Sequence, residues 1–177
     1  MLIVNQMKLL ADLQDDQYPY KQITHNRIIT RGVILNDKNE VLLLHLVGDD
    51  IFGHRDLYET PGGGIKPNET LEESLLREIK EETGIEAEII KPIGYVSDYY
   101  NLIGRHNNNY YYLLRFKNQG VNHLEDYEKT IIKGMDWYSI DKAIELYKSM
   151  NKDKLEILIS NRELPVMMEV KKLIETI

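Results

Sequence analysis

The segment from Pro61 to Ile85, PGGGIKPNETLEESLLREIKEETGI, constrains the fold of this chain more than any other. Its glycines and prolines preclude regular structure in the first part. Thr70 and Glu73 then have the spacing of a capping box, and apolar residues recur at helical spacing after them. Gly84 is suited to ending a helix. The segment therefore predicts an irregular loop followed by a helix over residues 70–83.

Three glutamates near the end of this helix break the local rules of helix stability. Glu78, Glu81 and Glu82 fall within an arc of roughly 100° on the helix, and Glu82 lies along the apolar face. They crowd the C-terminal end, where the macrodipole disfavours anions, and like charges four residues apart repel. A hard divalent cation, Mg²⁺ or Mn²⁺, would compensate the charges of the three glutamates. Phosphate oxygens of a substrate would be its expected further ligands. The alternative is an ordinary solvated charged face.

The glycine triplet before the helix favours the cation site over the solvated face. Gly62, Gly63 and Gly64 can bring backbone groups close to an ion or phosphate, although such a triplet alone is also typical of a turn. We predict an ion pair between Glu69 and Arg77 that fixes the loop over the carboxylates.

The rest of the chain predicts a mixed sheet with helices packed on it. Residues 1–20 are interpreted as an N-terminal appendage with a partly helical pattern, and residues 21–177 as one domain. Residues 118–129 are expected to form an acidic loop. Strands are predicted within 27–46 as a hairpin, then at 57–60, 85–97, 110–117 and 135–138, followed by a helix from Ser139 to about 150 and a last helix opened by Pro165.

Composition narrows the classes of function. The net charge of -7 gives a nucleic acid polymer or a membrane surface no general electrostatic reason to bind. The chain contains no cysteine, which excludes disulfides, cysteine-ligated metals and thiol nucleophiles. The first residues lack a basic region, and no apolar run approaches the ~20 residues of a membrane span. We expect a cytoplasmic protein.

The segment resembles the Nudix box, Gx5Ex7REUxEExGU, in which U is aliphatic. All nine defined positions match. They are Gly63, Glu69, Arg77, Glu78, Ile79, Glu81, Glu82, Gly84 and Ile85. The resemblance implies the family's α/β/α sandwich with a mixed β-sheet.

The resemblance also implies an activity. Nudix enzymes use Mg²⁺, or Mn²⁺, to hydrolyse a pyrophosphate bond in a nucleoside diphosphate linked to another moiety, and here ADP-ribose, ADP-sugars and nucleoside triphosphates are the leading substrates. Arg77 would orient the glutamates. The implied metal ligands are Glu78 and Glu82, a carbonyl of Gly62 or Gly63, and Glu81, which is either a ligand or an activator of water.

Outside the box the resemblance is looser. Family members often place a further glutamate, as general base or ligand, between late strands, and HLEDYEK offers Glu125, Asp126 and Glu128 there. We favour Glu125, although these acids could simply solubilise a loop.

Candidates for substrate binding are one aromatic residue and several arginines. Tyr100 lies near the position where subfamilies carry a marker, but position 101 is Asn and matches neither the tyrosine nor the proline marker. Arg27 and Arg31 share one face of a strand and could meet a terminal phosphate, as could Arg55 or Arg105. A plain surface charge is the alternative for each arginine.

Two alternatives to hydrolysis remain. A regulator of the same fold could sense a nucleotide without turnover, but such proteins usually degrade their box. The isoprenoid isomerase branch of the fold depends on a catalytic cysteine, which this chain lacks. Residues 1–20 and 150–177 exceed a minimal Nudix domain and suggest homodimer contacts or a cap.

Overall fold

Alternating side chains in the central strands give the sheet two apolar faces, and each face is covered by helices. The computed structural model describes residues 7–177. In β2 (His25–Leu35), Val33 and Leu35 belong to one core cluster, whereas Ile34 belongs to a second. Since neighbouring residues of a strand point to opposite faces, the two clusters lie on opposite sides of the sheet.

The elements follow the predicted mixture of strands and helices. Within residues 7–177, eight strands form one mixed sheet in the order β1-β6-β7-β2-β3-β4, with β5 paired to β2 and β8 paired to β3. Besides β2, the strands are β1 Leu9–Leu13, β3 Val41–Asp50, β4 Gly53–Glu59, β5 Gly62–Gly64, β6 Ile85–Tyr100, β7 Arg105–Gln119 and β8 Ile132–Tyr138. The α-helices are α1 Leu71–Thr83, α2 Asp126–Ile131, α3 Ile140–Ser149 and α4 Lys154–Ile174.

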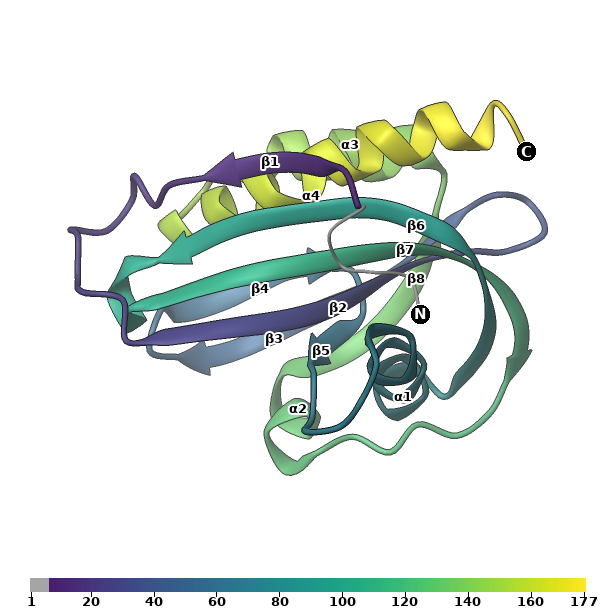
Figure 1. Ribbon diagram of the computed structural model, residues 1–177, viewed down its shortest axis with the longest axis horizontal. Helices are drawn as coiled ribbons and strands as arrows, with labels where there is room; N and C mark the ends of the chain where they lie inside the picture. Colours follow the sequence, from purple (N-terminus) through teal and green to yellow (C-terminus); the bar gives the residue numbers. More distant parts are fainter. Residues whose placement is uncertain (1–6) are drawn as a thin grey trace.

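The helices form two layers with the sheet between them. Figure 1 shows α3 and α4 along one side of the sheet and α1 on the other, with α2 near one end of α1. This arrangement confirms the predicted α/β/α sandwich. Among residues 7–177, no helix combines the length and the apolar character needed to cross a membrane.

The sheet opens between β2 and β3, and this opening makes room for the candidate site. The two strands pair where Leu35 meets Val41. Beyond that point, residues 29–31 of β2 pair with the glycine strand β5, while β3 pairs with β8 and β4. The glycine loop therefore enters the sheet beside β2 and lies close to α1.

The N-terminal segment and the acidic loop differ from expectation. Residues 9–13 form β1, which pairs in parallel with β6 at the edge of the sheet, so pairing with an existing strand overrides the weak helical pattern. Residues 1–6 of the predicted appendage lie outside the described part of the chain. Within the predicted acidic loop, Asp126–Ile131 form the short helix α2.

The prediction that Pro165 opens the last helix was wrong. Helix α4 begins at Lys154, and Pro165 lies in its interior. The Asp153 carboxylate caps the helix, accepting a hydrogen bond of 2.9 Å from the Glu156 amide. Leu155 and Ile159 are buried against the core before the proline is reached. Their burial favours a continuous helix despite the backbone hydrogen bond that proline removes.

Helix α1 begins one residue after the predicted start, because Thr70 is its N-cap, and ends at the predicted residue 83. The Thr70 hydroxyl accepts from the Glu73 amide at 3.2 Å, and the Glu73 carboxylate accepts from the Thr70 amide at 2.8 Å. Gly84 ends the helix in the left-handed conformation, with φ of 73°. A Cβ on Gly84 would lie 2.5 Å from the carbonyl oxygen of Gly120.

Replacing Gly84 with alanine should destabilise the fold, because the new Cβ meets both an unfavourable φ and a backbone carbonyl. We expect Gly84→Ala to lower the free energy of unfolding by more than about 1 kcal/mol, measured by urea denaturation. Gly134→Ala is the matched control, since a Cβ there meets nothing within 4 Å. Equal losses in the two variants would contradict this account.

Candidate active site

Three carboxylates from two helices converge at one end of the opening in the sheet. Glu78 and Glu82 of α1 and Glu128 of α2 each place one oxygen within 4.8 Å of the others. Glu78 and Glu82 are only 8% and 9% exposed. Buried like charges at this separation are costly unless a cation compensates them, so the cluster is a candidate cation site.

The electrostatics of the cluster agree with that interpretation. Burial raises the pKa of Glu82 well above its ordinary value, and the charges of Glu78 and Glu128 raise it further against a hydrogen bond from Gly62. Burial also raises the pKa of Glu78, although Arg77 opposes this shift. Burial thus disfavours the charged forms of Glu78 and Glu82, and a bound divalent cation would favour them.

The glycine loop lies directly against these carboxylates. The Gly62 amide donates to the Glu82 carboxylate at 2.8 Å. A Cβ on Gly63 would lie 2.5 Å from the Glu78 carboxylate, and one on Gly62 would lie 2.0 Å from the Thr30 carbonyl oxygen. Any side chain at these positions would displace either the carboxylate or the strand, so the close approach requires glycine.

Arg77 connects the loop to the helix. Its guanidinium donates to both oxygens of Glu69, at 2.5 and 2.9 Å, so the predicted ion pair is present. It also donates to Glu78 at 2.7 Å, to Glu81 at 3.0 Å and to the Gly64 carbonyl at 3.2 Å. The hydrogen bond from Arg77 is the main cause that lowers the pKa of Glu69 to about 2. Arg77 thus fixes the loop over the carboxylates and holds Glu78 and Glu81 in place.

The donor set fits a hard cation such as Mg²⁺ or Mn²⁺. Its atoms are carboxylate oxygens from Glu78, Glu82 and Glu128, and such cations prefer oxygen ligands. Glu81 differs from the other two box glutamates, because it turns toward Arg77 and lies 3.9 Å from the Lys66 ammonium. Glu78 and Glu82 are thus the two box glutamates that share the cluster.

The structure brings Glu128, rather than the favoured Glu125, into the cluster. The Glu128 carboxylate accepts from the Glu125 amide at 2.7 Å, which orients it at the start of α2. Glu125 lines the adjoining pocket and lies outside the three-carboxylate group. Sequence reasoning expected a loop at these positions, and only the geometry of the helix decides which of the two acids meets α1.

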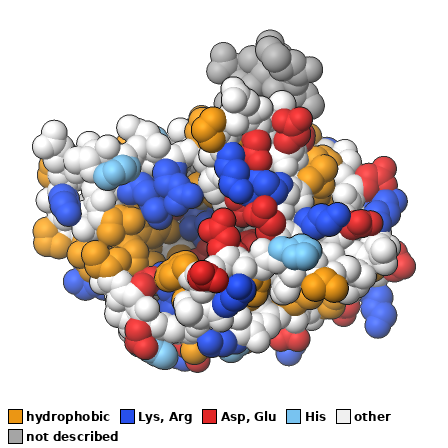
Figure 2. Space-filling model, turned by 90° about the horizontal axis from the view of Figure 1, so that it is seen from below, with side chains coloured by type: hydrophobic (Ala, Val, Ile, Leu, Met, Phe, Trp, Pro, Cys, Tyr) orange, Lys and Arg blue, Asp and Glu red, His pale blue; other side chains and the backbone are white. Residues whose placement is uncertain are grey.

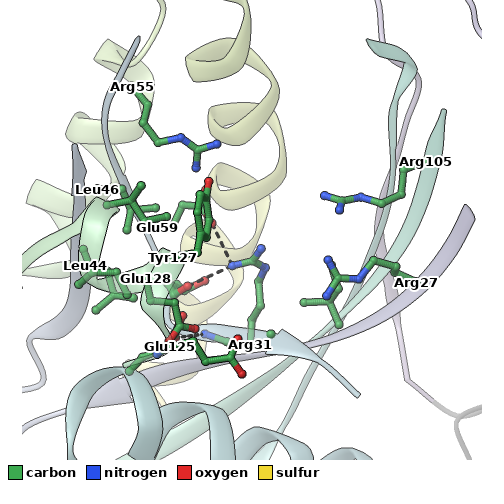
Figure 3. Close-up of a pocket in the computed structure, with 17 residues that line it drawn as sticks. Arg27, Arg31, Leu44, Leu46, Arg55, Glu59, Arg105, Glu125, Tyr127 and Glu128 are labelled. Atoms are coloured by element: carbon green, nitrogen blue, oxygen red, sulfur yellow. Dashed lines mark hydrogen bonds and ion pairs between the residues drawn. The ribbon is translucent and has the colours of Figure 1, made fainter. Parts of the chain in front are cut away.

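A pocket of about 400 Å³ extends from the carboxylates and adjoins a second hollow of about 380 Å³. Arginines line both. Figure 3 shows Arg27 and Arg105 on one side, Arg55 and Tyr127 on the other, and Glu128 at one end, with the arginine side chains turned toward the space between them. In Figure 2, acidic and basic side chains gather on either side of this hollow. A pocket with carboxylates at one end and guanidinium groups beyond suits a cation together with a polyanion.

The predicted substrate-binding residues differ in their surroundings. Arg31 is buried and donates to Glu59 at 3.2 Å and to the Thr60 carbonyl at 3.1 Å. Arg55 is paired with Asp50. The Tyr100 hydroxyl accepts from Arg162 at 3.0 Å, so this tyrosine is held in the wall. Arg27 lies exposed at the mouth.

Sequence reasoning missed a buried ionic network behind the pocket. Arg162 of α4 donates to Glu59 at 3.1 Å and to Glu163 at 2.9 Å. Glu163 in turn accepts from the Thr60 hydroxyl at 3.1 Å. The network therefore ties α4 to the residues that immediately precede the glycine loop. The adjacent Arg-Glu pair in an otherwise apolar helical pattern was the available signal.

Comparisons with known proteins agree with this geometry. The family model described as NUDIX domain matches residues 25–159. An RNA pyrophosphohydrolase of a Marinomonas species is 36% identical over 62 residues, 35% of each chain. An ADP-ribose pyrophosphatase of Methanocaldococcus jannaschii is 33% identical over 82 residues, 46% of each chain. The alignments thus span about a third to a half of the length of these curated relatives.

A solved structure shows the same fold. The NUDIX hydrolase from Nitrosomonas europaea superposes with a TM-score of 0.63 at 18% identity, covering 83% of this chain and 89% of that one. At this identity the likeness concerns the fold alone.

Removing the Glu128 carboxylate should weaken cation binding, because it deletes one of three converging oxygen donors. We expect Glu128→Gln to lower the Mn²⁺ affinity measured by isothermal titration calorimetry by about tenfold or more. Glu125→Gln is the matched control on the same turn and should keep the affinity of the unaltered protein. Equal affinities in the two variants would remove Glu128 from the site.

Proposed function

The chain belongs to the Nudix domain family, and from this premise we propose that it is a magnesium-dependent pyrophosphohydrolase acting on nucleoside diphosphate derivatives. The observation that carries the proposal is the convergence of Glu78, Glu82 and Glu128 at one end of an arginine-lined pocket. Such a pocket can hold a cation and a phosphate chain side by side. The family match and the names of the two curated relatives support the same class of reaction.

In the proposed reaction, the oxygen of a water molecule forms a bond to one phosphorus, and the bridging P–O bond of the anhydride breaks. The water loses a proton to a carboxylate, and two phosphate products leave. Bound Mg²⁺ would supply charge neutralisation of the phosphates and a lowered pKa for the attacking water. The protein contributes mainly position and charge.

Several box residues have a role in this scheme. Glu78 and Glu82 would hold the cation, with Glu128 as a third carboxylate and a Gly62 or Gly63 carbonyl as an additional ligand. Arg77 keeps Glu78 and Glu81 oriented through the hydrogen bonds described above.

For the proton acceptor we propose Glu125. It lines the pocket and is exposed, and it lies outside the carboxylate cluster. Glu81 is the alternative, but its carboxylate is already engaged by Arg77 at 3.0 Å.

For the substrate, two classes lead. ADP-ribose or an ADP-sugar is supported by the name of the Methanocaldococcus relative. A nucleoside triphosphate is supported by the arginines of the pocket, which suit a polyanion. Both are small-molecule nucleotides, in agreement with the net charge of -7, which disfavours binding along a polymer. We also propose that the protein is cytoplasmic and that residues 1–20 and 150–177 contribute homodimer contacts.

Glu82→Gln should abolish turnover, because it removes a buried cation ligand while keeping the shape of the side chain. We expect release of nucleoside monophosphate to require Mg²⁺ and to fall by about a hundredfold or more in this variant. The measurement is product release from a panel of nucleoside triphosphates and ADP-sugars, with and without chelator.

The same panel distinguishes an enzyme from a nucleotide-sensing regulator. Tight nucleotide binding without product after prolonged incubation would favour the regulator. Unchanged turnover in Glu82→Gln would contradict the proposed role of the box.

A further inference from the structure

Within the described part of the chain, two of the pocket arginines have no acidic partner, whereas the others are neutralised within the wall. Arg31 pairs with Glu59, Arg55 with Asp50, and Arg162 with Glu163. Among residues 7–177, Arg27 and Arg105 form neither an ion pair nor a hydrogen bond through their guanidinium groups. The wall therefore carries two positive charges in excess.

Arg27 and Arg105 lie close together and face the same space. They belong to β2 and β7, which pair in parallel with His25 opposite Arg105 and Arg27 opposite Asn107. Residues two apart on a strand share a face, so both side chains leave the sheet on the same side. Figure 3 shows both guanidinium groups turned into the pocket that also contains Glu82 and Glu128.

The position of Arg105 is costly for a charged group without a partner. Arg105 is half-buried, and its Nε atom is buried without a hydrogen-bond partner in the structure. Its guanidinium lies over the Tyr100 ring, 5.7 Å from the centroid. Burial, followed by the charge of Arg27, lowers the pKa of Arg105. An isolated exposed arginine is ordinary, but a half-buried one beside a second guanidinium requires compensation.

The nearby carboxylate compensates Arg105 only through its charge, which raises the pKa of Arg105. Asp98 of β6 is buried, and one of its oxygens accepts hydrogen bonds from the amides of Asn107, at 3.2 Å, and Asn109, at 2.8 Å. Its other oxygen is buried without a hydrogen-bond partner among residues 7–177, so Asp98 forms no ion pair with Arg105 in this part of the chain. The two guanidinium groups are thus left to a group that arrives from solution.

The glycine loop separates this positive end from the carboxylates. A Cβ on Gly64 would lie 2.4 Å from the Arg27 guanidinium, as one on Gly63 would meet Glu78. The same three-residue strand therefore makes room for carboxylates through one glycine and for a guanidinium through the next. The loop divides a cation-binding end from an anion-binding end within one pocket.

We propose that Arg27 and Arg105 bind a phosphate group of the substrate that is separate from the phosphorus attacked at the carboxylates. This inference rests on the proposed function and narrows its substrate class. The preferred substrate carries an additional phosphate, either as the end of a triphosphate chain or as a phosphomonoester on the moiety beyond the pyrophosphate. A substrate whose distal half is a neutral sugar leaves both arginines without a partner.

Kinetics with three substrates test the proposal. We would compare ATP, ADP-ribose, and a sugar pyrophosphate that carries a separate phosphomonoester, using Arg27→Gln, Arg105→Gln and the double variant. For a substrate whose additional phosphate meets Arg27 and Arg105, kcat/KM should fall by about tenfold or more for each arginine replaced, chiefly through a higher KM. ADP-ribose turnover should change by less than about threefold, since no phosphate meets the arginines. A loss confined to ATP would identify the phosphate as the end of a triphosphate chain. A loss confined to the sugar pyrophosphate would identify it as the phosphomonoester.

Lys117→Gln is the matched control. Lys117 lies on the same strand as Arg105, is exposed and pairs with Glu88 outside the pocket. The Lys117→Gln substitution removes one positive charge from the protein outside the site. It should therefore leave kcat/KM for all three substrates unchanged. Parallel losses for ADP-ribose and for the phosphorylated substrates would overturn the proposal.

A binding measurement separates this inference from the proposed function. Inorganic triphosphate would be titrated calorimetrically into Glu82→Gln, with and without Arg105→Gln, so that turnover plays no part. A loss of affinity of about tenfold with the arginine change supports the site even if no hydrolysis is ever found. Equal affinities overturn the site even if the unaltered protein is an active hydrolase.

Discussion

The interaction on which the rest of this structure depends is the repulsion between buried carboxylates at the end of α1. Glu78 and Glu82 are buried and lie close to the partly buried Glu128, and the surrounding groups make this arrangement tolerable. Arg77 neutralises one side, the Gly62 amide meets Glu82, and glycine backbone replaces side chains that would fill the space. A helix stabilised for its own sake would not carry these acids, and their arrangement suits a compensating cation.

The box was predictable from sequence because its interactions are local. The caps of α1, the pairing of Glu69 with Arg77 and the inward direction of Glu82 all follow from spacing along one loop and one helix. Residues contributed by distant segments were harder to predict. Glu128 reaches the cluster only because α2 forms, in a segment whose sequence has no apolar periodicity that would predict a helix. Residues 9–13 form β1 because they pair with the edge strand β6.

The buried ionic network explains why the last helix could not be placed from local signals. Proline is unfavourable in a helix interior, yet α4 continues on both sides of Pro165. Nearby in the same helix, Arg162 binds Glu59 and Glu163 binds the Thr60 hydroxyl. These contacts join α4 to the end of β4 and depend on tertiary structure. They hold the strand that leads into the glycine loop, so the far helical layer supports the geometry of the site without lining the carboxylate cluster.

Helix α2 has a consequence for how such a protein can change over evolutionary time. Its six residues carry Glu128 into the carboxylate cluster and, one position earlier, Tyr127 into the wall of the adjoining hollow. In the proposed function, reactivity and choice of substrate thus depend on the same turn of backbone. A lineage that reshapes this turn for a new substrate also moves a carboxylate of the cluster, so new specificities are more accessible through β2 and β7, whose side chains line the pocket without entering the cluster.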